Sequence, residues 1–325
     1  MLRLGTLSSA FRRYGRYFQA PSFVLLYHRV ADLATDPWKL CVSPRHFAEQ
    51  LEVLEENAGP VVPLGEFAVG RPARHSVAIT FDDGYVDNLL AAAPALERKG
   101  MPATFFIATG YIDSFREFWW DELEKAILSS ATLPSVLSLE IEGRAFKRPV
   151  PASEDRSARR NFYYELYDVL IELPSPTLTT VMDCIVKWAS VSPSVRETHR
   201  TLSVEQLGKL ASSPLMQFGA HSVSHSALPA LPPSLRRQEM WDSRRTLERW
   251  LNRSITETSY PYGRYCADTM VAAREAGFTA AFTTEPGPHC ADASRYALPR
   301  VCIGDWNGDE FVKRLRDRFR GGSTL

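Results

Sequence analysis

Short apolar runs alternate with amphipathic segments along most of the chain. The apolar runs predict strands at residues 23–27, 77–81, 104–108, 216–220, 258–261, 278–282 and 298–301. The amphipathic segments predict helices that begin near residues 44, 87, 203, 233 and 309, and one that ends at residue 277. Strands that alternate with helices indicate an α/β fold with a mostly parallel sheet, either open or closed into a barrel.

This alternation is interrupted between about residues 113 and 200. The interrupted stretch predicts a helix from Trp119, a β-hairpin at 136–147 around Glu142 and Gly143, and helices near 156–172 and 176–190. We interpret it as a helical insertion on a loop of one domain that covers residues 22–325. Because functional variation gathers on loops, we expect the insertion to shape substrate choice, with Trp119 and Trp120 near the mouth of the cleft.

Residues 1–21 form a separate amphipathic segment. Its four arginines meet no acidic residue, and its apolar residues recur at helical spacing. One interpretation is an interfacial helix on an anionic membrane, and the other is a terminal helix packed against the protein's own body. Two glycines weaken a helix of either kind, and we favour the packed helix.

The composition limits the class of binding partner and the cellular compartment that we expect. The 38 basic and 38 acidic residues cancel, so no overall charge favours nucleic acid as a partner. The five cysteines are odd in number and lack paired short spacings, which disfavours a disulfide framework and favours a reducing compartment. No membrane span or signal peptide is recognisable. We therefore expect a cytoplasmic protein, with peripheral contact at the inner face of the membrane if residues 1–21 are interfacial.

Two adjacent carboxylates, Asp82 and Asp83, follow the second predicted strand in the sequence TFDDGY. The carboxyl ends of parallel strands face the ligand crevice in α/β folds. Neighbouring carboxylates there repel each other unless a cation or a shared proton relieves them. The alternative is that an aspartate at this place only caps the following helix.

Two histidines, His221 and His225, follow another predicted strand in the sequence HSVSH. Imidazoles four residues apart face the same way on one helical turn and can bind one metal ion. The alternative is a pair of unrelated polar histidines in a loop. One aspartate with two histidines makes a three-ligand set that leaves positions open for water and substrate, as catalytic metal sites require.

A third motif, YPYG at 260–263, also stands at the end of a predicted strand. Pro261 fixes the local backbone and Gly263 permits a tight turn. Such a turn can aim a backbone N–H at a developing oxyanion, although a simple structural turn has the same sequence.

The three motifs together resemble the polysaccharide deacetylase family (carbohydrate esterase family four), whose domain is a distorted, incomplete (β/α) barrel. The resemblance covers about residues 22–110 and 201–310, with the insertion outside it. It implies a metal-dependent enzyme that removes N-acetyl groups from an N-acetylated amino sugar in a polysaccharide, an oligosaccharide or a glycolipid precursor.

The resemblance also assigns roles by position. Asp83, His221 and His225 match the metal ligands, and Asp82 matches the general base that activates the attacking water. Tyr262 matches the residue whose backbone N–H helps to hold the oxyanion. Zinc is the default metal, and iron, cobalt or nickel suit the same ligands.

Two positions depart from the family pattern. Ser259 stands where many members carry an arginine that orients the base, and Arg300 is our candidate to replace that cation; its alternative is a surface or structural arginine. The usual late acid histidine is also missing. However, Leu26-Tyr27-His28 resembles the circularly permuted subgroup that deacetylates poly-N-acetylglucosamine, which makes His28 the candidate acid and a satisfied structural histidine the alternative.

Two other functions remain open from the sequence. The first is another amide or C–N hydrolase on the same fold. The second is a catalytically silent carbohydrate-binding module, with Trp119, Trp120 and Tyr111 as lining residues. The intact Asp82 argues against the silent module.

Overall fold

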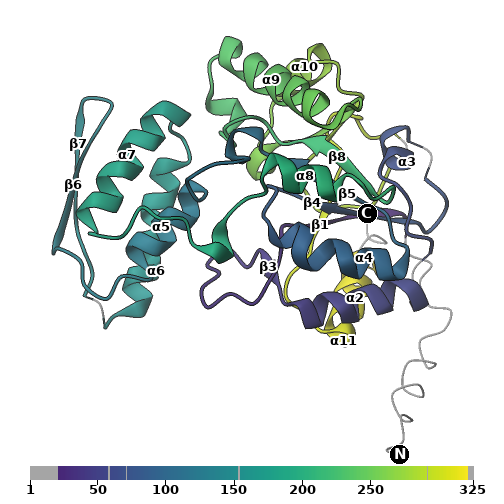
Figure 1. Cartoon of the computed structure of the whole chain (residues 1–325), viewed down its shortest axis with the longest axis horizontal. Helices are drawn as coiled ribbons and strands as arrows, with labels where there is room; N and C mark the ends of the chain where they lie inside the picture. Colours follow the sequence, from purple (N-terminus) through teal and green to yellow (C-terminus); the bar gives the residue numbers. More distant parts are fainter. Residues whose placement is uncertain (1–20, 58, 71, 153, 291, 321–325) are drawn as a thin grey trace, which may run out of the picture.

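A computed structural model describes residues 21–57, 59–70, 72–152, 154–290 and 292–320 of the chain (Figure 1). Apart from residue 21, the segment expected at 1–21 lies outside the described residues. No helix among the described residues is long and apolar enough to cross a lipid bilayer. All five cysteines are free thiols.

The centre of the molecule is a parallel sheet. Its strands, in spatial order, are β10 (Ala280–Phe282), β9 (Glu257–Ser259), β8 (Met216–Ala220), β5 (Ala103–Ile107), β4 (Val77–Phe81), β1 (Phe23–Tyr27) and β11 (Val301–Cys302). Every residue of β1, β4 and β5 is buried, as expected for a parallel sheet that is covered on both faces.

The last strand brings the two edges of this sheet together. Val301 and Cys302 pair with β1 at one edge, while Leu298 forms a parallel bridge with Phe282 of β10 at the other. The sheet is therefore curled, and the predicted distorted, incomplete (β/α) barrel is confirmed. The strand expected at 298–301 is displaced because this segment changes its pairing partner midway.

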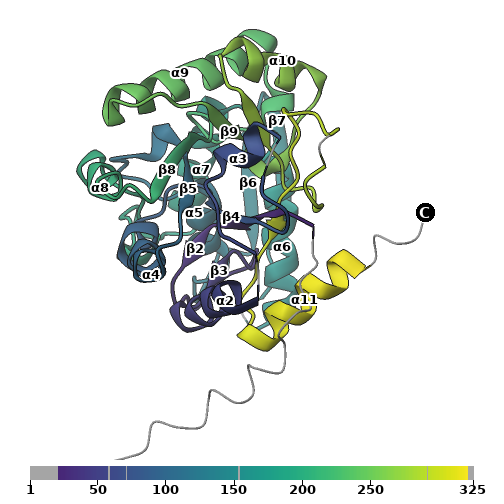
Figure 2. The ribbon, with the colours of Figure 1, turned by 90° about the vertical axis from the view of Figure 1, so that its right-hand side faces the viewer.

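Helices surround the sheet (Figure 2). They are α2 (Pro44–Asn57), α3 (Gly65–Ala68), α4 (Ala93–Lys99), α8 (Val204–Leu210), α9 (Pro233–Leu251), α10 (Ala267–Glu275) and α11 (Gly308–Arg320). A π-helical turn at Asn88–Ala92 precedes α4, and short 3-10 turns occupy Thr109–Tyr111, Glu197–His199, Leu228–Ala230 and Pro261–Gly263. A capping box between Ser203 and Gln206 begins α8 at the expected place.

Strands β9 and β10 are shorter than expected. The strand predicted at 258–261 ends at Ser259, because Pro261 has no N–H to donate to a strand and starts a 3-10 turn instead. The strand predicted at 104–108 is displaced by one residue.

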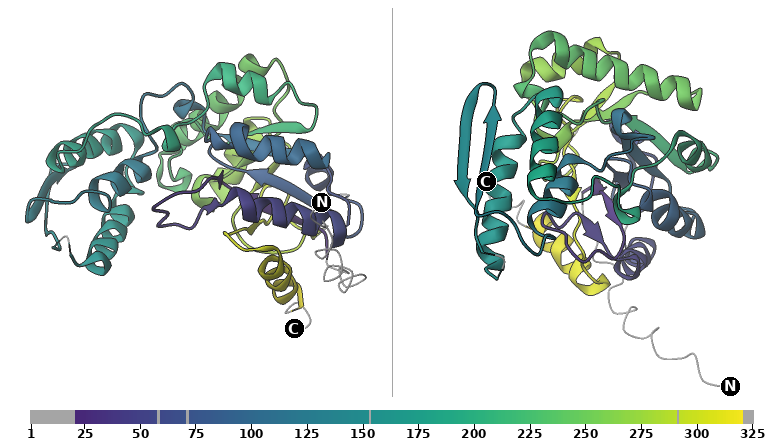
Figure 3. Two further views of the ribbon diagram at one scale, coloured as in Figure 1. Left: turned by 60° about the horizontal axis from the view of Figure 1, so that its bottom comes forward. Right: turned by 60° about the vertical axis from the view of Figure 1, so that its left-hand side comes forward.

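The helices and the hairpin expected between about 113 and 200 are present. They are α5 (Trp119–Ile127), β6 (Val136–Ile141), β7 (Arg144–Pro149), α6 (Arg156–Leu170) and α7 (Ser175–Trp188). They pack around a hydrophobic core of their own, which Tyr85, Ala108 and Ala227 of the barrel join. Figure 3 shows this segment as a lobe at one side of the barrel.

A small parallel pair, β2 (Arg29–Val30) and β3 (Cys41–Val42), follows β1. We call the loop that joins them, residues 31–40, the strap.

Candidate active site

The two carboxylates and the two histidines meet at one end of the barrel. Asp82 and Asp83 follow β4, and His221 follows β8. Oδ1 of Asp83 lies 3.1 Å from Nε2 of His225 and 3.5 Å from Nε2 of His221, and these two nitrogens are 3.1 Å apart. All four side chains are buried. Ligand atoms this close repel one another unless a cation or protons lie between them.

The expectation of a helical turn at residues 221–225 is wrong. Ser222 and His225 have positive φ angles of 60° and 53°, so the segment is an irregular loop. Glu239 of α9 accepts hydrogen bonds from the amides at 223 and 224, at 2.8 and 2.9 Å. These side-chain acceptors replace the bonds of a helix, and the strained backbone turns both imidazoles toward Asp83.

The two imidazoles are held in different ways. Nδ1 of His221 lies 2.9 Å from the carbonyl oxygen of Ser259, which can only accept, so Nδ1 carries a proton and Nε2 is the nitrogen that faces Asp83. Oγ of Ser259 is 2.6 Å from the same nitrogen. The ring of His225 is fixed by packing instead, with the rings of Trp120 and Tyr262 at 4.7 and 4.5 Å between centroids.

The side chains of Asp83, His221 and His225 fit a divalent metal ion. Oδ1 of Asp83 is buried and lacks a hydrogen-bond partner, although two imidazole nitrogens lie beside it. One ligand atom from each of Asp83, His221 and His225 lies within 4.8 Å of the others. Burial raises the pKa of Asp83, but the two imidazoles outweigh it and hold that pKa below its usual range. An ionised carboxylate with two imidazoles suits zinc and its neighbours in the transition series.

Arg300 lies against Asp82, where we expected a cation to replace the family's base-orienting arginine. Its Nη1 and Nη2 donate to the two carboxylate oxygens of Asp82 at 2.7 and 2.6 Å. Thr80 and the carbonyl of Thr283 accept its remaining hydrogen bonds, and its side chain is fully buried. Burial opposes ionisation of Asp82, but Arg300 and then His221 hold the pKa of Asp82 below its usual range.

A pocket of about 280 Å³ opens above these groups. Its lining residues are His28, Trp38, Leu40, Asp82, Asp83, Trp120, Tyr167, His221, His225, Tyr262, Thr284 and Cys302. His28 follows β1 and shares the pocket with Asp82 and Asp83. Burial, the largest influence, lowers the pKa of His28 below its ordinary value of 6.5 against the opposing effect of the two aspartates.

The aromatic residues expected at the cleft have different places. Trp120 is buried and lines the pocket. Trp119 donates from Nε1 to the hydroxyl of Tyr262 at 2.9 Å, and together with Tyr111 it lines a neighbouring cavity. Sequence reasoning missed Trp38, whose only signal is a lone tryptophan in a polar loop.

Comparisons with known proteins agree with this geometry. A family model described as polysaccharide deacetylase matches residues 70–131 and 161–281. YxkH of Bacillus subtilis (strain 168) is 23% identical over 285 residues, which cover 86% of this chain and 70% of YxkH. The family match includes parts of the segment 113–200 that the sequence motifs had left outside the resemblance, and residues of that segment line the pocket.

Two solved structures show the same fold. The Streptococcus pyogenes deacetylase PplD in complex with acetate superposes with a TM-score of 0.59 at 19% identity, covering 91% of this chain and 98% of PplD. IcaB from Ammonifex degensii superposes with a TM-score of 0.58 at 18% identity, covering 92% of this chain and 97% of IcaB.

Proposed function

The chain belongs to the polysaccharide deacetylase family, and from this premise we propose that it is a metal-dependent hydrolase that removes N-acetyl groups from an N-acetylated amino sugar. The substrate would be part of a polysaccharide, an oligosaccharide or a glycolipid precursor. The observation that carries the proposal is the convergence of Asp83, His221 and His225 beside an aspartate that Arg300 holds through both oxygens.

In the proposed reaction, a metal held by Asp83, His221 and His225 would supply a Lewis acid for the acetamido carbonyl and lower the pKa of the attacking water. Asp82, kept ionised beside Arg300, accepts a proton from that water.

The remaining steps use two further residues. The backbone N–H of Tyr262 helps to hold the oxyanion. His28 gives a proton to the amine nitrogen as the C–N bond breaks, so that the products are acetate and a free amino sugar.

A silent binding module is disfavoured by the Asp82–Arg300 pair. A buried carboxylate that is held through both oxygens beside three metal-ligand side chains has no role in sugar binding alone. A different amide hydrolase on this fold would use the same groups, so only substrates separate it from the amino-sugar deacetylase.

The test is acetate release from N-acetylglucosamine oligomers, lipid-linked N-acetyl sugars and unrelated amides, each with and without a chelator. We expect acetate from an amino sugar, loss with the chelator, and recovery when zinc is restored. Asp82→Asn should retain the metal and lose roughly a hundredfold or more of the turnover. Release from unrelated amides alone would favour the second hydrolase, and chelator-resistant turnover would contradict metal dependence.

A further inference from the structure

The strap connects the barrel to the insertion at the rim of the pocket. Figure 1 shows it beside β3, reaching toward the insertion. Two hydrogen bonds to α6 fix its tip: the hydroxyl of Tyr164 donates to the carbonyl of Pro37 at 2.7 Å, and Nε1 of Trp38 donates to the hydroxyl of Tyr163 at 2.9 Å. The position of Trp38 is therefore set by two parts of the molecule together.

Trp38 presents an apolar surface to the pocket. Its ring lies 4.2 Å from the ring of Tyr167 and 5.1 Å from that of Tyr164, measured between centroids, yet 37% of the residue remains exposed. Because Tyr163 satisfies its single N–H, the exposed part of Trp38 is available for apolar contact. Tryptophan is enriched at contact surfaces, because its large apolar ring can meet a partner while its N–H is hydrogen-bonded.

The dimensions of the pocket locate the substrate. About 280 Å³ lies just below the usual range for ligand pockets, so the pocket accommodates one sugar unit and not several. The reacting acetamido group must lie at the end that holds Asp83 and the histidines. Trp38, Leu40 and Tyr167 line the same pocket and have no role in the proposed reaction, so they are available to contact the sugar ring.

We propose that Trp38, supported by Tyr167, is the platform on which the pyranose ring of the reacting residue stacks. A pyranose has an apolar face of C–H groups, which matches the flat exposed surface of the tryptophan ring. This inference rests on the proposed deacetylase function and narrows it: the site recognises the ring of an N-acetylated pyranose and not merely an acetyl group on any amine.

A purely structural role for Trp38 makes a different prediction. If the residue only docks the strap onto α6, then loss of the other docking bond should have a similar effect. Tyr164→Phe removes the hydrogen bond to Pro37 and changes no residue that lines the pocket. It is therefore the matched control for Trp38→Ala.

The experiment compares two substrates in the zinc-loaded full chain: an N-acetylglucosamine pentamer and 4-nitrophenyl acetate, which has an acetyl group but no sugar. We expect Trp38→Ala to raise KM for the pentamer by roughly tenfold more than KM for the aryl acetate. Trp38→Phe should recover part of the loss, and Tyr164→Phe should behave like the parent with both substrates. Equal effects of Trp38→Ala on both substrates, or the same effect in Tyr164→Phe, would overturn the platform.

A binding measurement separates this inference from the proposed function. Titration of the pentamer into Asp82→Asn, followed by tryptophan fluorescence, should show binding that weakens roughly tenfold in Asp82→Asn/Trp38→Ala. Equal pentamer binding by the two proteins overturns the platform even if the parent releases acetate. If the parent binds the pentamer through Trp38 but releases no acetate from it, the proposed reaction fails and the platform stands.

Discussion

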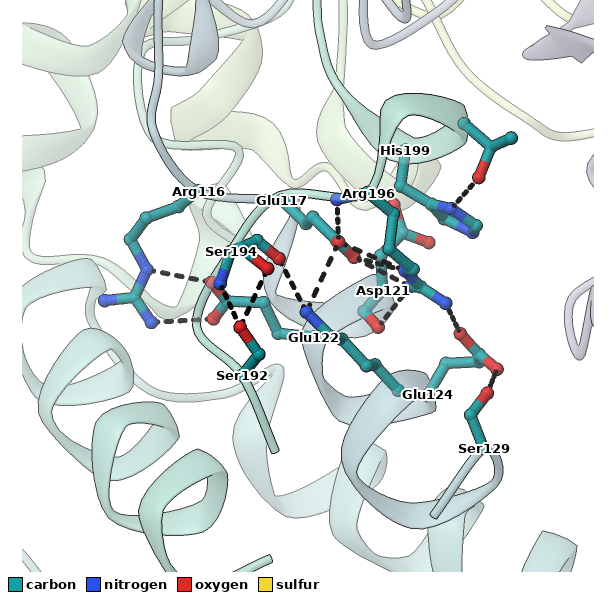
Figure 4. Close-up of polar contacts among 12 residues, drawn as sticks. Arg116, Glu117, Asp121, Glu122, Glu124, Ser129, Ser192, Ser194, Arg196 and His199 are labelled. Carbon is teal, nitrogen blue, oxygen red and sulfur yellow. Dashed lines mark hydrogen bonds and ion pairs between the residues drawn. The ribbon is translucent and has the colours of Figure 1, made fainter. Parts of the chain in front are cut away.

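The barrel and the insertion both bury charged side chains, but they do so differently. In the barrel, the buried charges surround one small volume, in which Arg300 pairs with Asp82 and the histidines face Asp83. In the insertion, Arg196 bridges two almost fully buried glutamates, Glu117 and Glu124, at 2.7 and 2.6 Å (Figure 4). Every charge of that second network has a partner of opposite sign.

We interpret the difference as a division between a reactive site in the barrel and structural support in the insertion. In the barrel, Oδ1 of Asp83 is buried without a hydrogen-bond partner, whereas the Arg196 network is complete within the chain. The insertion instead contributes the aromatic side chains of Trp120 and Tyr167 to the wall of the pocket. We therefore expect changes in the barrel to alter the reaction itself and changes in the insertion to alter stability or substrate choice.

The largest effect is expected for His221→Ala. Loss of one imidazole from the three-ligand cluster should remove bound metal and lower turnover by roughly a thousandfold or more. The matched control in the comparison is His199→Ala, because His199 is also buried but lies beside the insertion's ionic network. Metal analysis of both proteins checks the contrast. Full occupancy in His221→Ala, or loss of metal in His199→Ala, would break it.

The next largest effect concerns His28. As the acid, His28 must carry its proton, so activity is present below its pKa and is lost as the pH rises through it. Burial places that pKa below 6.5. We expect His28→Gln to keep the metal, lose roughly a hundredfold of the turnover, and lose this alkaline limb of the rate profile. Profiles of kcat against pH for both proteins check this, and an unchanged limb would leave His28 a structural role only.

Arg300→Lys tests how closely the barrel must position its base. A lysine keeps the charge but cannot bind both oxygens of Asp82 in the planar geometry of a guanidinium. We expect roughly a tenfold loss of kcat with little change in KM, because the base is misplaced while the sugar contacts remain. Steady-state kinetics measures both constants. A loss confined to KM would show that Arg300 acts on substrate binding.

How far the sequence predicts this site depends on the residue. Asp82, Asp83 and His221 follow regular strands, so apolar runs locate them and the parallel sheet brings them together. The position of Arg300 was open to two interpretations, because its contact with Asp82 joins residues 218 apart in the chain.

The parts that could not be predicted depend on irregular backbone and distant contacts. The loop at 221–225 has strained φ angles that no residue type there signals, and its partner Glu239 is an ordinary helix residue by sequence. Trp38 enters the pocket only because the strap binds to α6 of the insertion.

The smallest effect is expected within the insertion, at Asp121. Its Oδ2 accepts a hydrogen bond from the hydroxyl of Tyr85 at 2.7 Å, and the same hydroxyl receives Nε1 of Trp120 at 3.0 Å. Burial raises the pKa of Asp121 from 3.8 to about 7, more than Arg29 and Tyr85 lower it. The folded state therefore binds the Asp121 proton more tightly than the unfolded state does.

This shift has a definite sign for stability. Between about pH 4 and pH 7 the folded protein holds more protons at Asp121 than the unfolded chain, so the free energy of unfolding falls as the pH rises through that window. Solvent still reaches part of Asp121 and screens its charge, so we expect a loss on the order of 1 kcal/mol. Asp121→Asn keeps an acceptor for Tyr85 and should remove this loss, with the metal and the turnover unchanged.

Urea unfolding of both proteins from pH 5 to pH 8 measures the difference. The control is Asp168→Asn, which changes an exposed carboxylate of the same lobe. A pH dependence that persists in Asp121→Asn would assign it to another group, and a loss of turnover would show that the insertion reaches the chemistry through Tyr85.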